Sequence, residues 1–154
     1  MASIVEKETA IPAERPQVAA VFVNRLRAGM RLQSDPTIIY GITLGKTKLD
    51  RPILKSDIEA KTPYNTYRIA GLPPTPIANP GKESLAAVLN PIESKALYFV
   101  ADGNGGHVFA ETLEEHRKNV RKWRVVEKSL AAEAEAAGEG ARVGLDLAVV
   151  GARA

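Results

Sequence analysis

The spacing of apolar residues in the first third of the chain predicts short helices separated by proline and glycine. Residues 2–10 are typical of the end of a helix, which Pro12 terminates. A second helix is expected to begin at Pro16 and to stop at Gly29, because proline suits the first helical turn and glycine suits the position after the last. Its inward face is formed by apolar residues at helical spacing, namely Val18, Val21, Phe22 and Leu26. Asp35-Pro36 repeats the proline start and predicts a short helix to about Gly41.

An irregular loop is expected over residues 43–55, followed by a third proline-bounded helix. Ser56 and Glu59 have the spacing of a capping box, in which each side chain bonds the backbone of the other. The helix that they start cannot pass the Thr62-Pro63 step, because proline disfavours helical backbone in the residue before it.

The sequence after residue 79 predicts one more helix and then a β-hairpin. The helix follows Asn79-Pro80-Gly81 and stops at Asn90-Pro91. Its inward residues are expected to be Leu85, Val88 and Leu89. Leu97–Ala101 is a short, strongly apolar strand, and His107–Ala110 is its expected partner. The Gly-rich segment 102–106 joins two strands and opens no helix, which favours a hairpin turn over a phosphate-binding loop.

A final helix is predicted from a second capping box, formed by Thr112 and Glu115. Its apolar positions recur at spacings near 3.6, at Val120, Trp123, Val126 and Leu130. Composition then shifts to Ala, Glu and Gly, so residues 1–130 are expected to form one domain and residues 131–154 a helix fray with a disordered tail. The expected fold class is α+β, with helices packed against a small antiparallel sheet.

Composition narrows the function only slightly. The chain has 154 residues, of which 25% are charged and 45% hydrophobic, and these are ordinary globular values. It has no cysteine, which excludes disulfides and thiolate metal sites. A net charge of +3 is too weak to indicate nucleic-acid binding by itself. The basic residues 117–124 are expected to form a solvated helix face, with contact to an anionic polymer or membrane surface as the alternative. No run of about 20 apolar residues is present, so no membrane span is predicted.

The most informative segment is Tyr64–Gly81, which contains the sequence YNTYRIAGLPPTPIANPG. Its prolines fix the backbone and remove donors, so the segment must be a stiff, extended surface loop. Tyr64, Asn65 and Tyr67 offer flat apolar faces and short hydrogen-bonding groups that suit a groove for a polar polymer. The alternative interpretation is that the segment is only a rigid connector between two packed elements.

Six collinear segments, this one included, are similar to the YceG-like family, the endolytic murein transglycosylases of bacteria. The segments are Ala2–Thr9, Val21–Leu26, Leu32–Thr37, Tyr64–Gly81, Leu97–Asp102, and Gly106–Phe109 with Glu115-His116. They extend over roughly residues 2–125. The chain departs from the family pattern at Thr75, Ala110 and Arg117. None of these departures removes the proposed acid, although Thr75 alters the proline loop.

The resemblance implies a lytic transglycosylase that cleaves the bond between N-acetylmuramic acid and N-acetylglucosamine in nascent peptidoglycan and limits strand length. It implies no cofactor, and partners among the peptidoglycan synthases of the elongation or division machinery. The family is anchored in the inner membrane and faces the periplasm, with a LysM-like subdomain before this region. This sequence shows neither anchor nor signal peptide and is expected to be the catalytic portion. A non-catalytic module that binds peptidoglycan or division proteins is the alternative, and a nucleic-acid binder is a third hypothesis that rests only on the pI.

The expected chemistry needs only one carboxyl group. An acid protonates the leaving oxygen and then, as a carboxylate, takes the proton from the C6 hydroxyl, which attacks C1 and closes a 1,6-anhydro ring. The acid should lie against apolar surface that raises its pKa. The resemblance points to Glu6 as this acid. Glu8, two positions on, faces a different side of the helix, so only one of the two shares the groove with substrate.

The candidate substrate-binding residues are Gln33, Ser34, Tyr40, Tyr64, Asn65, Tyr67 and His107. Gln33 and Ser34 would bind N-acetyl or hydroxyl groups of the glycan, while Asp35 is expected to cap the helix that follows. His107 is expected to bond neighbouring loops, with a role in the site as the alternative. His107 and His116 are on different elements and are not expected to form a metal site.

Overall fold

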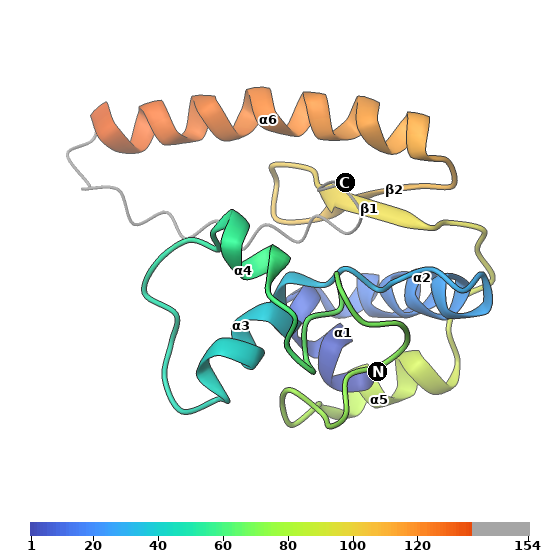
Figure 1. The fold of residues 1–154 in the computed structure, drawn as a ribbon. Coiled ribbons are helices and arrows are strands. Elements are labelled where there is room, and N and C mark those ends of the chain that lie inside the picture. Colours follow the sequence, from blue (N-terminus) through green and yellow to red (C-terminus); the bar gives the residue numbers. More distant parts are fainter. Residues whose placement is uncertain (137–154) are drawn as a thin grey trace.

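The computed structural model describes residues 1–136 as an α+β fold in which a two-stranded hairpin lies between the last helix and a body of shorter helices (Figure 1). Helices α1 (Ala2–Glu8), α2 (Arg15–Arg27) and α5 (Lys82–Leu89) form the body, with the short η1 (Pro12–Glu14) before α2. On one side lie α3 (Asp35–Thr43) and α4 (Lys55–Glu59). On another, the long α6 (Leu113–Ala136) runs past the hairpin of β1 (Tyr98–Ala101) and β2 (His107–Ala110).

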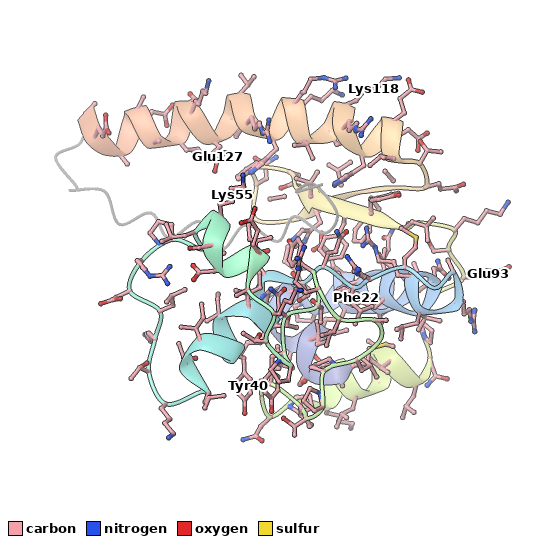
Figure 2. All side chains as sticks on the ribbon, viewed as in Figure 1. Phe22, Tyr40, Lys55, Glu93, Lys118 and Glu127 are labelled. Carbon is pink, nitrogen blue, oxygen red and sulfur yellow. The ribbon has the colours of Figure 1, made fainter. Side chains whose placement is uncertain are left out.

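Helix α2 lies at the centre of the body and contributes most of the main hydrophobic core. Val18, Val21 and Phe22 are fully buried, as the apolar spacing predicts. Phe22 points into the interior in Figure 2, whereas Lys118 points outward from α6. The Phe22 ring meets the Phe99 ring edge-on with centroids 6.0 Å apart, which joins α2 to β1. The Pro16 start and the Gly29 stop of the sequence prediction are confirmed, and Gly29 has a φ of +67° that glycine adopts without strain.

A buried arginine on α2 connects the body to two other segments. The Arg25 side chain is fully buried. Its Nε donates to the Leu97 carbonyl at 2.6 Å, and its Nη1 donates to the Arg31 carbonyl at 2.8 Å. The guanidinium also lies 5.0 Å from the centre of the Tyr98 ring, a cation–π distance. Because a buried charge is tolerated only where it is hydrogen-bonded, these contacts fix the start of β1 and the loop after α2 relative to each other.

The predicted hairpin is confirmed, with Tyr98 opposite Ala110 and Ala101 opposite His107. Gly103 in its turn has a φ of +91°, and a β-carbon there would lie 2.7 Å from a methyl group of Val126. Glycine is therefore required both by the backbone conformation and by the close approach of α6. Val100, Val120 and Trp123 form a second, smaller core between the hairpin and α6.

Three details of the sequence prediction are wrong. Helix α4 starts two residues earlier, with Leu54 at the N-cap position, because Asp57 accepts the Leu54 backbone N–H at 2.8 Å. Ser56 and Glu59 form no capping box. In α5, the buried residues are Ser84 and Ala87, whereas Leu85 is exposed and Leu89 is 78% exposed. Small side chains on the inner face let α5 approach α1 and α2 closely.

The capping box of Thr112 and Glu115 is confirmed by reciprocal bonds of 3.2 and 3.3 Å. Helix α6 continues to Ala136, beyond the predicted end near residue 130. The remainder of the predicted tail, residues 137–154, lies outside the described residues. Within the described part of the chain, none of the helices combines the length and the apolar character that crossing a bilayer requires.

His116 gives the fold a testable dependence on pH. Its ring is fully buried and stacks on Tyr98 with centroids 5.0 Å apart. Burial, and then the charge of Arg25, lowers the pKa of His116 from 6.5 to about 4. The unfolded chain therefore binds a proton between pH 6.5 and 4 that the folded chain does not, so stability falls as the pH falls through this window.

The variant His116→Phe keeps a stacking ring but cannot titrate. When the pH is lowered from 7 to 4.5, we expect its unfolding free energy to fall by about 2 kcal/mol less than that of the parent. Urea denaturation of both proteins at the two pH values measures this difference. Equal losses in the variant and the parent would show that His116 is protonated with an ordinary pKa in the folded state.

Candidate functional site

Three of the sequence motifs meet in one polar cluster, formed by the end of α1, the start of α3 and the loop 64–67. Thr66 is the centre of the junction. Its carbonyl accepts the Gln33 N–H at 3.2 Å, and its Oγ1 accepts the Ser34 N–H at 2.9 Å. The hydroxyls of Thr66 and Thr37 are 2.8 Å apart, and both side chains are fully buried. These bonds satisfy buried polar groups and fix the YNTY loop against the QSDPT segment.

Glu8 is the acidic residue of α1 that joins this cluster. Ser34 Oγ donates to Glu8 Oε1 across 2.5 Å, a short hydrogen bond. Glu8 is only 5% exposed, and it lies at the last position of α1. Ser34 itself is fully buried, so the hydroxyl that was predicted to bind sugar bonds the Glu8 carboxyl in this arrangement.

Asp35 and Tyr67 form the second polar pair of the cluster. The Tyr67 phenol donates to Asp35 Oδ1 across 2.6 Å, and both residues are buried. The N-cap position of α3 is Ser34, so Asp35 lies one residue later than the predicted cap, in the first helical turn. Asp35 therefore bonds a residue of the YNTY motif from 32 positions away, a contact that the local sequence does not indicate.

Gln33 has a strained backbone at the edge of the cluster. Its φ of +54° lies in the left-handed region, which is uncommon for a residue other than glycine. Arg25 Nη1 donates to the Gln33 side-chain oxygen at 3.1 Å and holds it in place. Burial lowers the pKa of Arg25 to about 10, so the guanidinium stays charged at neutral pH. Strained residues of this kind gather at binding and catalytic sites, which supports the choice of Gln33 as a candidate.

Glu6 faces a different group of residues from Glu8. Glu6 Oε2 accepts from Ser84 Oγ at 2.6 Å and from the Gly81 N–H at 2.9 Å, at the start of α5. Arg15 Nη2 lies 3.5 Å from Glu6 Oε1. The Ser84 hydroxyl, followed by the Gly81 N–H, lowers the pKa of the Glu6 carboxyl below its ordinary value. The expectation that apolar surface raises the pKa of Glu6 is therefore wrong, since its side chain is 25% exposed and lies among donors.

The aromatic candidates divide into an accessible pair and a buried residue. Tyr40 and Tyr64 are both half-buried, with ring centroids 4.9 Å apart. The Tyr64 hydroxyl is 2.8 Å from Thr75 Oγ1, which attaches the proline-rich loop to this aromatic pair. Tyr40 and Tyr64 therefore remain candidates for contact with a sugar, whereas the Tyr67 ring lies in the interior.

Asn65 is not a sugar-facing residue, and that prediction is wrong. It is 1% exposed, and its amide nitrogen donates to the carbonyls of Asp57, Ile58 and Ala60. Its Oδ1 accepts the Tyr67 N–H at 3.0 Å. The side chain thus ends α4 and shapes the YNTY turn, because it satisfies carbonyls that a helix end leaves without partners.

His107 bonds a neighbouring loop, in agreement with the default expectation. Its Nδ1 lies 2.8 Å from Glu14 Oε2, and its backbone N–H donates to Glu14 Oε1 at 2.9 Å. Thr9, which follows Glu8, also donates to Glu14 Oε2, at 3.2 Å. Glu14 therefore links the hairpin to the end of α1. Sequence analysis missed Glu14, Arg15 and Ser84, because their roles depend on partners that lie far away in sequence.

Comparison with known proteins identifies the family. The model of the YceG-like family matches residues 1–122, which confirms the resemblance, and the chain belongs to this family. A Bacillus subtilis (strain 168) protein named endolytic murein transglycosylase is 48% identical over 123 residues, which are 80% of this chain and 33% of that protein. A Streptococcus pneumoniae (strain D39) protein of the same name is 38% identical over 122 residues, 78% of this chain and 22% of that protein.

A solved structure has the same fold. The crystal structure of a YceG-like protein from Listeria monocytogenes superposes with a TM-score of 0.70 at 44% identity. The match covers 77% of this chain and 38% of that one. The predicted α+β class is therefore confirmed. The chain spans between about a fifth and two fifths of the length of these relatives.

The Glu6 contacts generate a prediction about stability. Glu6→Gln removes an anion from the start of α5 and should lower the unfolding free energy at pH 7 by about 1 kcal/mol. Because folding lowers the pKa of Glu6, its ionised carboxylate stabilises the folded state at pH values above the ordinary pKa of 4.5. This stabilisation is lost as the pH falls through the lower pKa of the folded state. The difference between variant and parent should therefore shrink towards pH 3.

Urea denaturation across this pH range measures the effect. Glu83→Gln is the matched control, because Glu83 also pairs with Arg15 at 3.5 Å but is largely exposed, and it should change stability by less than about 0.5 kcal/mol. A Glu6→Gln cost that persists unchanged at pH 3 would contradict the assignment, since it would come from packing and not from charge.

Proposed function

We propose that this chain contains the catalytic portion of an endolytic murein transglycosylase. Such an enzyme cleaves the bond between N-acetylmuramic acid and N-acetylglucosamine inside a glycan strand and leaves 1,6-anhydro ends. The observation that supports this most strongly is the cluster in which the IVEKET, QSDPT and YNTY segments meet and which contains two acidic residues, Glu8 and Asp35. Membership of the YceG-like family and the names of the relatives support the same reaction.

The chemistry needs one carboxyl group and no outside nucleophile. The protonated acid donates to the glycosidic oxygen as the bond from C1 breaks, and positive charge develops on the sugar ring. The resulting carboxylate accepts the proton of the C6 hydroxyl, whose oxygen forms the new bond to C1. The acid is then protonated again, and the strand ends in an anhydro ring. The nucleophile belongs to the same sugar, so its effective concentration is high.

The surroundings of the two acidic residues of α1 favour Glu8 over Glu6 as this acid. An acid must be protonated when substrate binds. Both carboxyl groups accept a bond from a serine hydroxyl, but Glu6 also accepts the Gly81 N–H and faces Arg15, which further stabilise its ionised form. Glu8 bonds Ser34, beside Gln33 and close to the Asp35–Tyr67 pair. Glu6 stabilises the start of α5 in this proposal, and the role that the resemblance gave it passes to Glu8.

The family resemblance extends the proposal to the cell. The full protein would be anchored in the inner membrane with this domain in the periplasm, where cleavage of nascent strands would limit their length and influence cell shape. Peptidoglycan synthases of the elongation or division machinery would be its partners. Tyr40 and Tyr64 would contact sugar rings, and Gln33 would bind an N-acetyl or hydroxyl group.

Substitution of each acid tests the assignment. Glu8→Gln keeps the size of the side chain but cannot donate the proton, so turnover on purified sacculi should fall by at least about a hundredfold. Glu6→Gln should lower turnover by less than about tenfold, through its effect on stability alone. Soluble fragments released per unit time are measured, and circular dichroism shows that both variants are folded. The reverse order of the two effects would return the acid role to Glu6.

The ends of the released strands test the reaction itself. If the C6 hydroxyl is the nucleophile, mass spectrometry should find 1,6-anhydro ends, each lighter by one water than a reducing end. A hydrolase would need a second carboxylate to activate water, and Asp35 is the acidic residue of the cluster to examine for that role. Asp35→Asn should therefore leave the type of end unchanged. Predominantly reducing ends from active protein would exclude the transglycosylase mechanism even if Glu8 proved essential.

A further inference from the structure

A basic hollow is lined by residues on either side of the loop 64–67, which contributes to the polar cluster. It has a volume of about 510 Å³. Its lining residues are Arg31, Lys61, Thr62, Pro63, Arg68 and Ile69. Half of these residues are cationic and none is acidic. We call this feature the basic hollow.

The lining of the basic hollow brings three cations together and includes no acidic residue to pair with them. Elsewhere, Arg51 pairs with Asp57 at 2.6 Å and Lys118 with Glu114 at 2.9 Å. Among residues 1–136, no ion pair involves Arg31, Lys61 or Arg68. Like charges that are brought together without counter-charges repel one another, and an anionic ligand removes that repulsion.

The basic hollow is connected to the polar cluster through Tyr67. Arg31 Nη1 donates to the Tyr67 carbonyl at 3.2 Å, which fixes one wall of the hollow. The phenol of the same tyrosine donates to Asp35 at 2.6 Å. Three residues after Arg31, Ser34 bonds Glu8. The basic hollow and the polar cluster are therefore held next to each other by Tyr67 and by the segment that follows Arg31.

We propose that the basic hollow binds an anionic oxygen group, a carboxylate or a phosphate, carried by the glycan strand that is cleaved. This inference rests on the proposed function. Peptide stems on the muramic acid residues carry free carboxylates, and a growing strand ends in a pyrophosphate. The arginine forks of Arg31 and Arg68 suit either group, because guanidinium binds two oxygens of a carboxylate or a phosphate at once.

The test neutralises the two cations that make no side-chain hydrogen bond within residues 1–136. Lys61→Gln/Arg68→Gln keeps Arg31, which also holds Tyr67. Lys46→Gln/Lys48→Gln is the matched control, since both lysines are exposed in the loop after α3, away from the hollow. The Kd of each protein is measured at low salt on two substrates: soluble glycan strands that bear peptide stems, and the same strands after an amidase has removed the peptides. Each measurement is repeated with inorganic pyrophosphate as competitor.

The double variant should bind peptide-bearing strands about tenfold more weakly than the parent, with the control unchanged, and the difference should shrink at high salt. A difference that disappears on stripped strands assigns the anion to the stem peptides. One that persists and is competed by pyrophosphate assigns it to the phosphate end. Equal binding by the double variant and the parent overturns the inference.

The same samples separate this inference from the proposed function. Anhydro ends formed by the parent report on the reaction, whereas the Kd comparison reports on the hollow. If the parent forms anhydro ends and the double variant binds as tightly as the parent, the anion-binding role of the basic hollow is rejected and the proposed reaction stands. If the double variant binds more weakly but the parent forms no anhydro ends, the proposed reaction is rejected and the anion-binding role of the basic hollow stands. The single variants Lys61→Gln and Arg68→Gln provide the same readout, each with part of the loss, if the double variant does not fold.

Discussion

The buried guanidinium of Arg25 is the interaction on which the arrangement of the site depends. It donates to the Leu97 carbonyl before β1, to the Arg31 carbonyl after α2 and to the side chain of Gln33. A charge in the interior costs several kcal/mol unless its donors are used, so these segments cannot move apart independently. The hairpin, the loop after α2 and the start of the polar cluster therefore keep one relative position.

The two acidic residues of α1 show how neighbours determine the role of a side chain. Glu6 and Glu8 are two positions apart, which places them on different sides of the helix. Glu6 meets a hydroxyl, a backbone N–H and an arginine at the start of α5, and its pKa is lowered. Glu8 meets Ser34, within a network of buried hydroxyls. In the proposed function, the same functional group therefore stabilises a helix end in one place and transfers a proton in the other.

The surroundings of the site combine a stiff loop with exposed charge. The proline-rich loop is attached to the Tyr40–Tyr64 pair through the Thr75 hydroxyl. The YNTY turn lies between the polar cluster and the basic hollow and contributes to both. A polymer with sugar rings and anionic substituents would find aromatic faces, hydrogen-bonding groups and cations on adjacent surfaces, which is the basis of both proposals.

The sequence by itself determined the elements and the family. Proline starts, glycine stops and apolar spacing located α2 and the hairpin, since these signals act through the local backbone. Only the tertiary structure decided which side of α5 is buried, that Asn65 bonds three carbonyls of the preceding segment, and that Glu6 lies among donors. Those outcomes depend on partners as many as 78 residues away, as in the bond between Ser84 and Glu6. Local propensity contains no information about such partners, because packing brings them together only when the chain folds.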